Sequence, residues 1–362
     1  MTTAVSAPAP RVPWLAHMHP AYFAMVMATG IVSLGAFLSG WPRLAQTLVV
    51  GNCAFFVILV ACLTLRCCCY PRQIIADLFN HGRCTGFFTI VAALGILGSQ
   101  FLIIEQWARF AAAFWVAAIV LWIILTYTIF TILTVKKVKP TFPEGINGGW
   151  LLAVVASQAV AVLGAQLALP LGWTHGAVMF FCLSMWLGSG MFYVWIISLI
   201  FYRYMFFPLS PGDLSPPYWI NMGAVAISAL AGTMLIAAAP QSPLLTALLP
   251  FLKGATLLFW ATATWWIPML FILGIWRHLY SNFPLRYDPL YWGVVFPLGM
   301  YTVATIRISL VMPNAAFLMA IPRVFFYIAL AAWLIIFLAL VKVLLRALFK
   351  ALSPSRRTPA AP

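Results

Sequence analysis

The sequence is poor in charged residues, and above all in acidic ones. Charged residues make up 7% of its 362 positions, against about 25% in a typical soluble domain. Only five are acidic: Asp77, Glu105, Glu144, Asp213 and Asp288. Hydrophobic residues make up 65% of the chain. This composition excludes a soluble globular protein and predicts an integral membrane protein that crosses the bilayer several times.

Motifs of enzyme, metal and cofactor chemistry are also missing. The chain has no glycine-rich phosphate loop, no nucleophile elbow and no His-Glu-x-x-His zinc motif. No histidine lies in the middle of an apolar run, where a membrane haem would need a pair. Cys67, Cys68, Cys69 and Cys84, with His81 in the same loop, could suggest a metal site, but they lack C-x-x-C spacing. The four cysteines are expected to be reduced thiols. We therefore predict no metal, no cofactor and no enzymatic activity, with a membrane enzyme or a cofactor-binding subunit as the alternative.

Long apolar runs make up most of the sequence. A helix needs roughly 20 apolar residues to cross a bilayer, and ten runs qualify: about 21–39, 44–65, 85–104, 110–135, 149–169, 176–202, 218–239, 246–275, 290–311 and 323–345. We predict an all-α membrane domain over residues 20–346. Residues 1–19 are expected to form a short disordered tail, and 347–362 a basic tail.

The basic residues predict the orientation of these spans. Fifteen of the twenty lie in the tails and in the loops after every second span, and five lie on the other side. Basic loops stay in the cytoplasm, so both termini are expected there, in a plasma or inner membrane. Topology thus accounts for most of the net charge of +15, and we predict no nucleic-acid partner.

The odd-numbered spans begin alike, which indicates an internal repeat. Each opens with a helix breaker, followed within one to three residues by an aromatic; the breakers are Pro20, Gly86, Gly149, Pro217 and Pro289. These breakers are 63 to 72 residues apart, so the unit is one helical hairpin. We predict ten transmembrane helices as five parallel hairpins around a central pore along the membrane normal, with the odd helices inside.

Small and polar residues in the middle of the odd spans are candidates for the pore lining. They include Thr29, Gly30, Gly95, Gln158 and Gly299. A lipid-facing helix has no need of such residues. The alternative is that they serve close helix packing instead.

One layer of the predicted pore contains a single large ring. The positions seven residues after each breaker are Met27, Ala93, Ala156, Ala224 and Phe296. Pro297 follows the phenylalanine and removes a backbone hydrogen bond, which predicts a kink. A movable aromatic in an apolar constriction can close a pore, so Phe296 and Pro297 are the candidate gate. The alternative is a kink that only improves packing.

Two stretches carry a family resemblance. HPAYFAMVMATGIVSLG and YWGVVFPLGMYTVATIRIS resemble the tellurite-resistance/dicarboxylate transporter family, which includes plant slow-type anion channels, yeast malate permease and the fungal sulfite pump. The resemblance covers about residues 20–346 and departs from the common pattern at Ala28, where glycine is frequent. It implies a homotrimer whose ten-helix protomers each enclose a pore of quasi-five-fold symmetry, with Phe296 as the occluding residue. The implied substrates are chloride and nitrate, malate and other C4-dicarboxylates, sulfite, or tellurite.

The sequence itself is consistent with a small anion as substrate. No acidic residue falls within a predicted span, and Arg307 lies toward the outer end of the ninth, where it would raise the local anion concentration. A snorkelling role for Arg307 is the alternative. Because ionisable groups are scarce in the spans, we favour channel-like or uniport movement. A proton-coupled carrier with a histidine relay, or one with an occluded central site, remains the rival.

Overall fold

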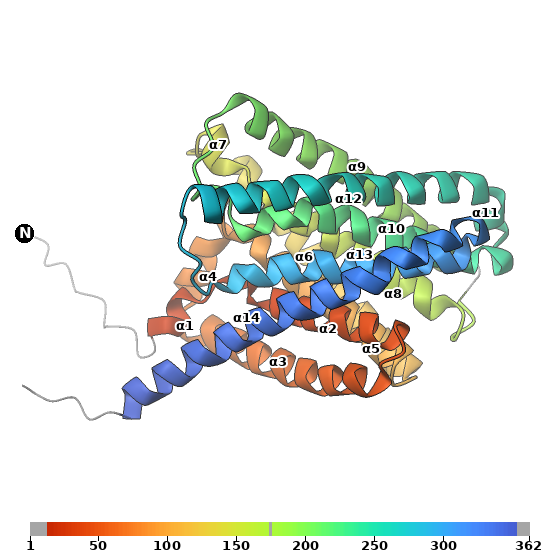
Figure 1. Cartoon of the computed structure of the whole chain (residues 1–362), viewed down its shortest axis with the longest axis horizontal. Coiled ribbons are helices and arrows are strands. Elements are labelled where there is room, and N and C mark those ends of the chain that lie inside the picture. The colour runs from red at the N-terminus through yellow and green to blue at the C-terminus, as the bar shows by residue number, and fades with distance from the viewer. Residues whose placement is uncertain (1–12, 174–175, 353–362) are drawn as a thin grey trace, which may run out of the picture.

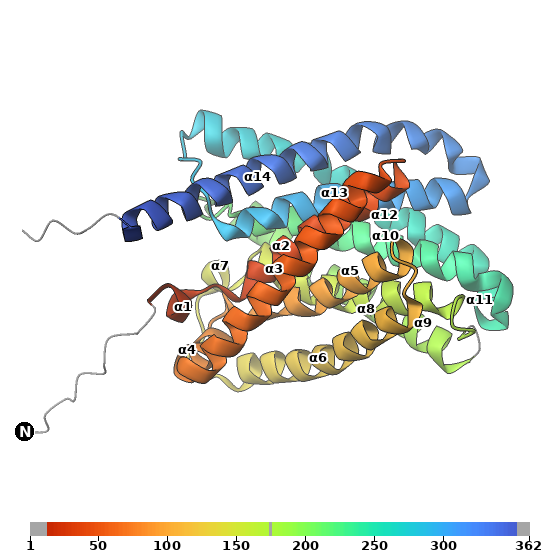
Figure 2. The same cartoon turned by 90° about the horizontal axis from the view of Figure 1, so that it is seen from below.

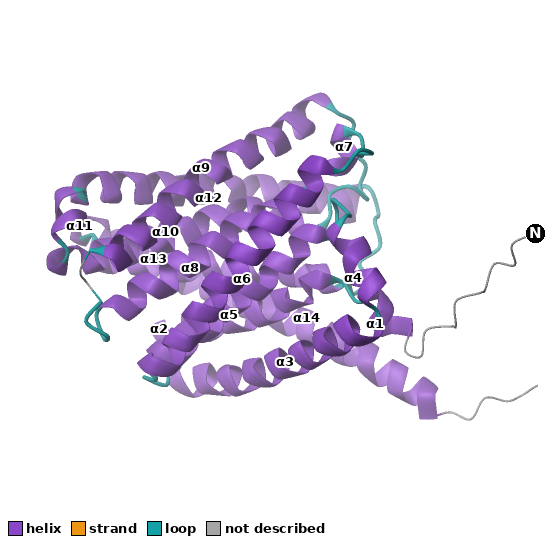
Figure 3. Ribbon diagram, turned by 180° about the vertical axis from the view of Figure 1, so that it is seen from behind, coloured by secondary structure: helices purple, strands orange, loops and turns teal. Residues whose placement is uncertain are grey.

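The computed structural model describes residues 13–173 and 176–352, and in these ranges the regular structure is helical, with no strand (Figure 3). Ten helices in the described part of the chain are long and apolar enough to cross a membrane. The prediction of an all-α membrane protein with ten spans is confirmed. The outer parts of the two predicted tails, 1–12 and 353–362, lie outside the described residues.

The five odd spans share one local design. Each opens with a short 3₁₀ turn and continues as an α-helix: α2 (Ala24–Leu38), α5 (Phe88–Ile103), α8 (Leu152–Ala168), α10 (Ile220–Ala238) and α13 (Trp292–Val311). The turns are η1 (Pro20–Phe23), η2 (Cys84–Phe87), η3 (Gly148–Leu151), η4 (Pro216–Trp219) and η7 (Pro289–Tyr291). Three of them begin with proline, whose fixed φ and missing N–H suit the first position of a helix.

The even spans return across the molecule as longer helices. They are α3 (Pro42–Cys69), α6 (Ala108–Val135), α9 (Ala177–Phe206), α12 (Leu249–Ile275) and α14 (Ala320–Leu352). A π-helical turn, η6 (Trp276–Tyr280), extends α12. Shorter elements complete the described chain: α1 (Pro13–His17), α4 (Pro71–Leu78), α7 (Phe142–Gly145), α11 (Pro243–Ala247), η5 (Ala239–Gln241) and η8 (Pro313–Met319).

The odd-span helices form an inner ring. In chain order each packs on the next, α2 on α5, α5 on α8, α8 on α10 and α10 on α13, and α13 packs back on α2. Their membrane windows are 78 to 94% buried, whereas those of the outer helices are 17 to 44% buried. The contacts follow the order expected for five hairpins around an axis, with the outer helices facing lipid.

Both ends of the chain lie on one face of the molecule, at the left in Figures 1 and 2, where α1 and the end of α14 are found. We call this the terminal face; it also carries α4, α7 and the segments 207–215 and 281–288. The residues 13–19 of the predicted disordered tail are ordered here. Leu15 and Met18 are buried, and Arg66 Nη2 donates to the carbonyl of Ala16 (3.0 Å) and to Asp77 (2.8 Å).

Candidate functional site

A cavity of about 230 Å³ opens at the terminal face, on the axis of the inner ring. Each of the five hairpin starts contributes to its wall, through His19, Thr85, Asn147, Tyr218 and Leu290. All five inner helices therefore turn their N-termini toward one space. Unpaired N–H groups and the helix dipoles make such an end attractive to negative charge.

Glycines allow these hairpin starts to approach one another. A Cβ on Gly148 would lie 2.4 Å from the carbonyl oxygen of Pro217, and one on Gly86 would lie 2.8 Å from the backbone nitrogen of Ala21. Any larger residue would push neighbouring turns apart. Glycine at these two positions thus lets the turns around the cavity lie close together.

Side chains of both signs line this cavity. The guanidinium of Arg203 is buried and donates to the Tyr218 hydroxyl (2.7 Å) and to the carbonyl of Pro143 (2.7 Å). Asp213 lies 3.5 Å from Arg203 Nη2. Hydrogen bonds from Ser210 hold the pKa of Asp213 below its ordinary value. Glu144 also lines the cavity, so its side chains carry two carboxylates against the single guanidinium of Arg203. Attraction for an anion at this end therefore rests on the helix N-termini.

A second, much smaller cavity lies further along the same five helices. Leu34, Ile96, Val162, Leu230 and Val303 bring one side chain from each inner helix to its wall. Its volume is about 10 Å³, roughly what one water molecule requires. It cannot admit a hydrated anion.

Arg307 lines this second cavity, together with Ser99 and Gln166. The Ser99 hydroxyl lies 2.7 Å from Gln166 Oε1, which accepts its hydrogen bond. No carboxylate of the described residues lies within ion-pair distance of Arg307. A half-buried cation therefore faces the axis at the end opposite the terminal face.

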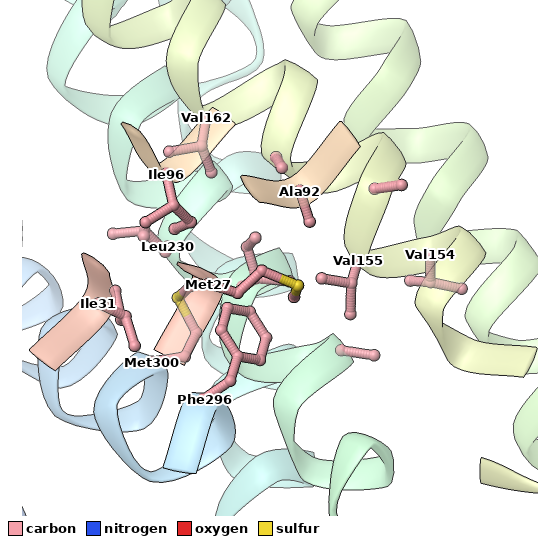
Figure 4. Packing of buried hydrophobic residues seen from close by; sticks show 14 of the residues in the cluster. Met27, Ile31, Ala92, Ile96, Val154, Val155, Val162, Leu230, Phe296 and Met300 are labelled. Atoms are coloured by element: carbon pink, nitrogen blue, oxygen red, sulfur yellow. The ribbon is translucent and has the colours of Figure 1, made fainter. Parts of the chain in front are cut away.

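An apolar plug separates the two cavities. Figure 4 shows the Phe296 ring against Met27 and Met300, with Ala92 and Val155 on the other side of Met27. Phe296 and Met27 are each 1% exposed, and Met300 is fully buried. Along α13, Leu290 lines the first cavity and Val303 the second, so Phe296 lies about 10 Å from either by helical rise. We call Phe296, Met27 and Met300 the plug.

Comparison with known proteins identifies the family. A model of the voltage-dependent anion channel (SLAC1) family matches residues 17–341. The chain belongs to this family. An uncharacterised membrane protein of Mycobacterium tuberculosis is 40% identical over 148 residues, which cover 41% of this chain and 74% of the relative. An uncharacterised transporter of Methanocaldococcus jannaschii is 25% identical over 81% of this chain and 85% of the relative. The sulfite efflux pump SSU1 of Trichophyton rubrum is 25% identical over 90% of each chain.

Two residues predicted to line the pore of this SLAC1 family member are instead bonded to outer helices. The indole of Trp333 on α14 donates to Thr29 Oγ1 (3.0 Å). Gln158 Nε2 donates to the carbonyl of Trp186 on α9 (3.2 Å). Both side chains therefore point away from the axis. The sequence contained no sign of this, because the inner helices are buried on every side and lack a polar stripe.

The predicted pore glycines lie at helix contacts. A Cβ on Gly30 would lie 2.2 Å from Ile96, one on Gly95 would lie 2.9 Å from Ala159, and one on Gly299 would lie 2.8 Å from Ile31. Gly95 also lines the second cavity. Close packing, the alternative reading of these residues, is thus what the structure shows for Gly30 and Gly299.

The structure brings together two members of the predicted layer. Met27 and Phe296 meet, as expected. Ala93, Ala156 and Ala224 are fully buried, but the residues beside the plug on α5 and α8 are Ala92 and Val155 (Figure 4). The breakers occupy different places in their turns: Pro20 and Pro289 come first in η1 and η7, Gly149 second in η3 and Gly86 third in η2. A fixed count of seven residues therefore reaches different positions of the inner helices.

α13 continues through Pro297. The carbonyl of Gly293, one turn earlier, has no N–H to accept from at that position. The proline ring packs on α10, where a Cβ on Gly223 would lie 2.7 Å from its Cγ. The predicted break is therefore a missing hydrogen bond inside a continuous helix, directly beside the plug.

Sequence reasoning missed Met300, Ala92 and Val155 in the plug region, and Thr85, Asn147 and Arg203 in the first cavity. Met300 had a usable signal, since it lies one helical turn after Phe296. No sequence signal pointed to Arg203, because it was counted only among the basic residues of the loops.

Proposed function

We propose that the chain conducts small anions along the axis of its five inner helices, as a channel or uniporter rather than as an enzyme. The observation that carries this proposal is the pair of cavities on the same five helices, separated by the plug. An ion entering either cavity meets Phe296 and Met27 before it can reach the other. In this reading Phe296 is the gate and Pro297 supplies the local freedom to move it.

The inner helices along this path favour negative ions, although Asp213 and Glu144 line the first cavity together with Arg203. None of the five inner helices contains an acidic residue. Five helix N-termini surround one cavity, and Arg307 lines the other. Family membership supports an anion, and the similarity to fungal sulfite efflux pumps over 90% of the chain makes sulfite the first candidate. C4-dicarboxylates, tellurite, chloride and nitrate are the other candidates.

We further propose that the protein lies in the plasma or inner membrane with the terminal face in the cytoplasm, as a homotrimer. The basic residues support this orientation. An interior-negative potential then favours efflux, by roughly 2.3 kcal/mol per charge per 100 mV. All inner helices run in the same direction from the terminal face, which suits a fixed pore better than the inverted repeats of alternating-access carriers.

A proton-coupled carrier is the second candidate, and His19 is the observation that favours it. His19 lines the first cavity, and its Nδ1 accepts a hydrogen bond from the Ala21 amide (3.1 Å). Burial, and then the nearby Arg83 guanidinium, lower the pKa of His19 to about 4. A group that stays neutral near pH 7 is a poor proton carrier there, so the passive mechanism is preferred.

Replacing the gate residue tests the proposal. We expect Phe296→Ala to raise anion flux through liposomes at least ten-fold, the effect of removing about 1.4 kcal/mol of barrier. Phe88→Ala is the matched control, because Phe88 is also fully buried but packs on Phe130 of α6, with ring centroids 6.2 Å apart. Each variant loses a buried ring at a cost of about 3–5 kcal/mol in stability.

Three results would contradict parts of the proposal. Equal flux in folded Phe296→Ala and in Phe88→Ala would remove Phe296 as the gate. Faster flux of potassium than of sulfite or chloride would remove the anion selectivity. A fixed stoichiometry of protons to anions would replace the passive mechanism with the coupled carrier.

A further inference from the structure

A pocket of about 390 Å³ opens between the fourth and fifth hairpins near the terminal face. It is separate from the axis of the inner ring. The walls that lie further from the terminal face belong to α12, through Leu270, Leu273 and Gly274, and to α14, through Ala332 and Ile335. We call this part the lower part of the pocket and the part nearest the terminal face its upper rim. Figure 1 shows α12 and α14 diverging toward the terminal face, with α13 between them. The volume is within the range of small-ligand sites, roughly 300–1,000 Å³.

The lower part of this pocket is apolar and open to the bilayer. Ile335 on one wall is 64% exposed, and Ile272 on α12 is 64% exposed beside the other. Both lie on helices whose outer surface faces lipid. A hydrocarbon chain can therefore enter from the membrane without crossing a polar barrier.

The upper rim is basic. Arg277, His278 and Arg286 line it, and no carboxylate does. The Arg277 guanidinium lies 4.3 Å from the centre of the Phe283 ring and donates through Nη1 to the carbonyl of Leu214. Its Nε is buried and has no hydrogen-bond partner among the described residues. Arg286 is exposed.

Further features place this rim at the membrane surface. Arg277 and His278 lie in the π-helical turn η6, and such turns are frequent at functional sites. Trp219, Tyr287 and Tyr291 also line the pocket, and these aromatics favour the boundary between lipid and water. The rim is thus at headgroup depth, above an acyl-sized groove.

We propose that this pocket binds an anionic phospholipid, with its phosphate at Arg277 and Arg286 and an acyl chain between α12 and α14. A free phosphate would leave the apolar groove unused, and a lipid without an anionic group would leave the Arg277 and Arg286 guanidinium groups without a counter-charge. The site is close to the pathway, because Ser215 and Tyr218 belong to both this pocket and the first cavity. Bound lipid therefore supports one wall of the channel mouth.

A filling substitution tests the groove. Gly274 and Gly254 both lie on α12, and a Cβ at either would meet nothing within 4 Å. Only Gly274 lines the pocket. We expect phosphatidylglycerol added to the purified full chain to raise its melting temperature, and Gly274→Leu to abolish that rise. Gly254→Leu should keep it. Phosphatidylcholine with the same acyl chains should stabilise all three proteins less.

A charge substitution tests the rim. Arg286→Gln should weaken phosphatidylglycerol binding about five-fold, the effect of about 1 kcal/mol for one cation near an anionic surface. Arg72→Gln, an exposed arginine on α4, is the control and should change nothing. Native mass spectrometry of the same proteins counts the bound lipids. Soluble glycerol 3-phosphate should not compete.

Several outcomes would overturn the lipid site. One is equal binding of phosphatidylglycerol by the Gly274→Leu and Gly254→Leu variants. Another is equal stabilisation by phosphatidylcholine, and a third is full competition by glycerol 3-phosphate. A change of oligomeric state in Gly274→Leu would assign this face to contacts with a second copy. All of these results are independent of anion flux and of the gate.

Discussion

A single side chain, His19, both caps the first inner helix and lines the first cavity. Its Nδ1 accepts the Ala21 amide hydrogen at the start of the first inner helix, while the ring lines the first cavity. Accepting that hydrogen bond requires an unprotonated nitrogen. Burial, followed by the Arg83 charge, keeps the pKa near 4, against a usual 6.5. The folded state therefore holds the neutral ring.

This lowered pKa predicts an acid-sensitive fold. Between pH 6.5 and 4 the unfolded chain binds the proton at His19 and the folded chain does not, so the free energy of unfolding falls as the pH falls through this window. The full loss for such a shift is about 3 kcal/mol. Thermal melts of the detergent-solubilised protein from pH 7.5 to 4 measure it.

His19→Asn supplies the control for the acid effect. Its side-chain oxygen can still accept from the Ala21 amide, but it does not titrate. We expect a flatter dependence of melting temperature on pH in this variant. Identical pH profiles for the two proteins would show that other groups cause the acid sensitivity.

At the level of helices, small residues set how closely neighbours approach. Gly232 on α10 is the tightest contact of this kind with an outer helix: a Cβ there would lie 2.1 Å from Thr256 Oγ1 on α12 and 3.0 Å from the Trp186 ring on α9. α10 can lie between these two outer helices only because position 232 has no side chain.

Gly232→Ala should therefore destabilise the protein by about 1–3 kcal/mol through overpacking. Gly188→Ala is the matched control, since a Cβ on Gly188 in α9 meets nothing within 4 Å. It should instead stabilise slightly, by about 0.5–1 kcal/mol, because alanine favours a helix. Melting temperatures of the two variants give the comparison, and a destabilised Gly188→Ala would contradict the packing explanation.

The sequence predicted where the helices lie along the chain better than it predicted which residues of each helix face the axis. Apolar length alone located all ten spans, because a bilayer imposes one minimum length on every helix. The C-terminal ends of α9 and α14 extend beyond the predicted spans. An α-helix can continue past the apolar segment that crosses the membrane. Which residues face the axis could not be read, because Thr29 and Gln158 bond to outer helices that have no fixed sequence offset from them.

The local start of each hairpin explains the remaining error. The breakers were recognised as the beginnings of repeats, but not as 3₁₀ turns of three or four residues. Because the breakers stand first, second or third in these turns, a fixed count of seven residues reached Ala93 and Ala156, next to Ala92 and Val155. Met27 on α2 and Phe296 on α13 do lie side by side, and their role as a gate stays a prediction.

On the scale of the whole molecule, the place of Arg307 in the second cavity predicts that anion flux depends on ionic strength. A unit charge ~8 Å away in water contributes about 0.5 kcal/mol, so losing the Arg307 charge should reduce the local concentration of a monovalent anion about two-fold. For a divalent anion, the local concentration should fall about five-fold. We expect Arg307→Gln to lower flux by these factors at 10 mM salt.

Salt provides the internal check on this prediction. At 1 M the Debye length falls to about 3 Å, and flux through Arg307→Gln and wild type should converge. Arg43→Gln, an exposed arginine at the start of α3 that lines neither cavity, is the control and should behave as wild type. A deficit in Arg307→Gln that persists at high salt would indicate a direct contact rather than a long-range field.

The contact between the first and last hairpins has a consequence for synthesis. α13 packs on α2, and Trp333 on α14 bonds to Thr29 on α2, across 304 residues of chain. Because a chain is made from its N-terminus, four hairpins precede the segment that completes the ring. That segment is also the one that carries Phe296. An incomplete ring therefore lacks one wall and two of the three plug residues, Phe296 and Met300. The last hairpin supplies this wall and these two residues together, so a complete ring always contains them.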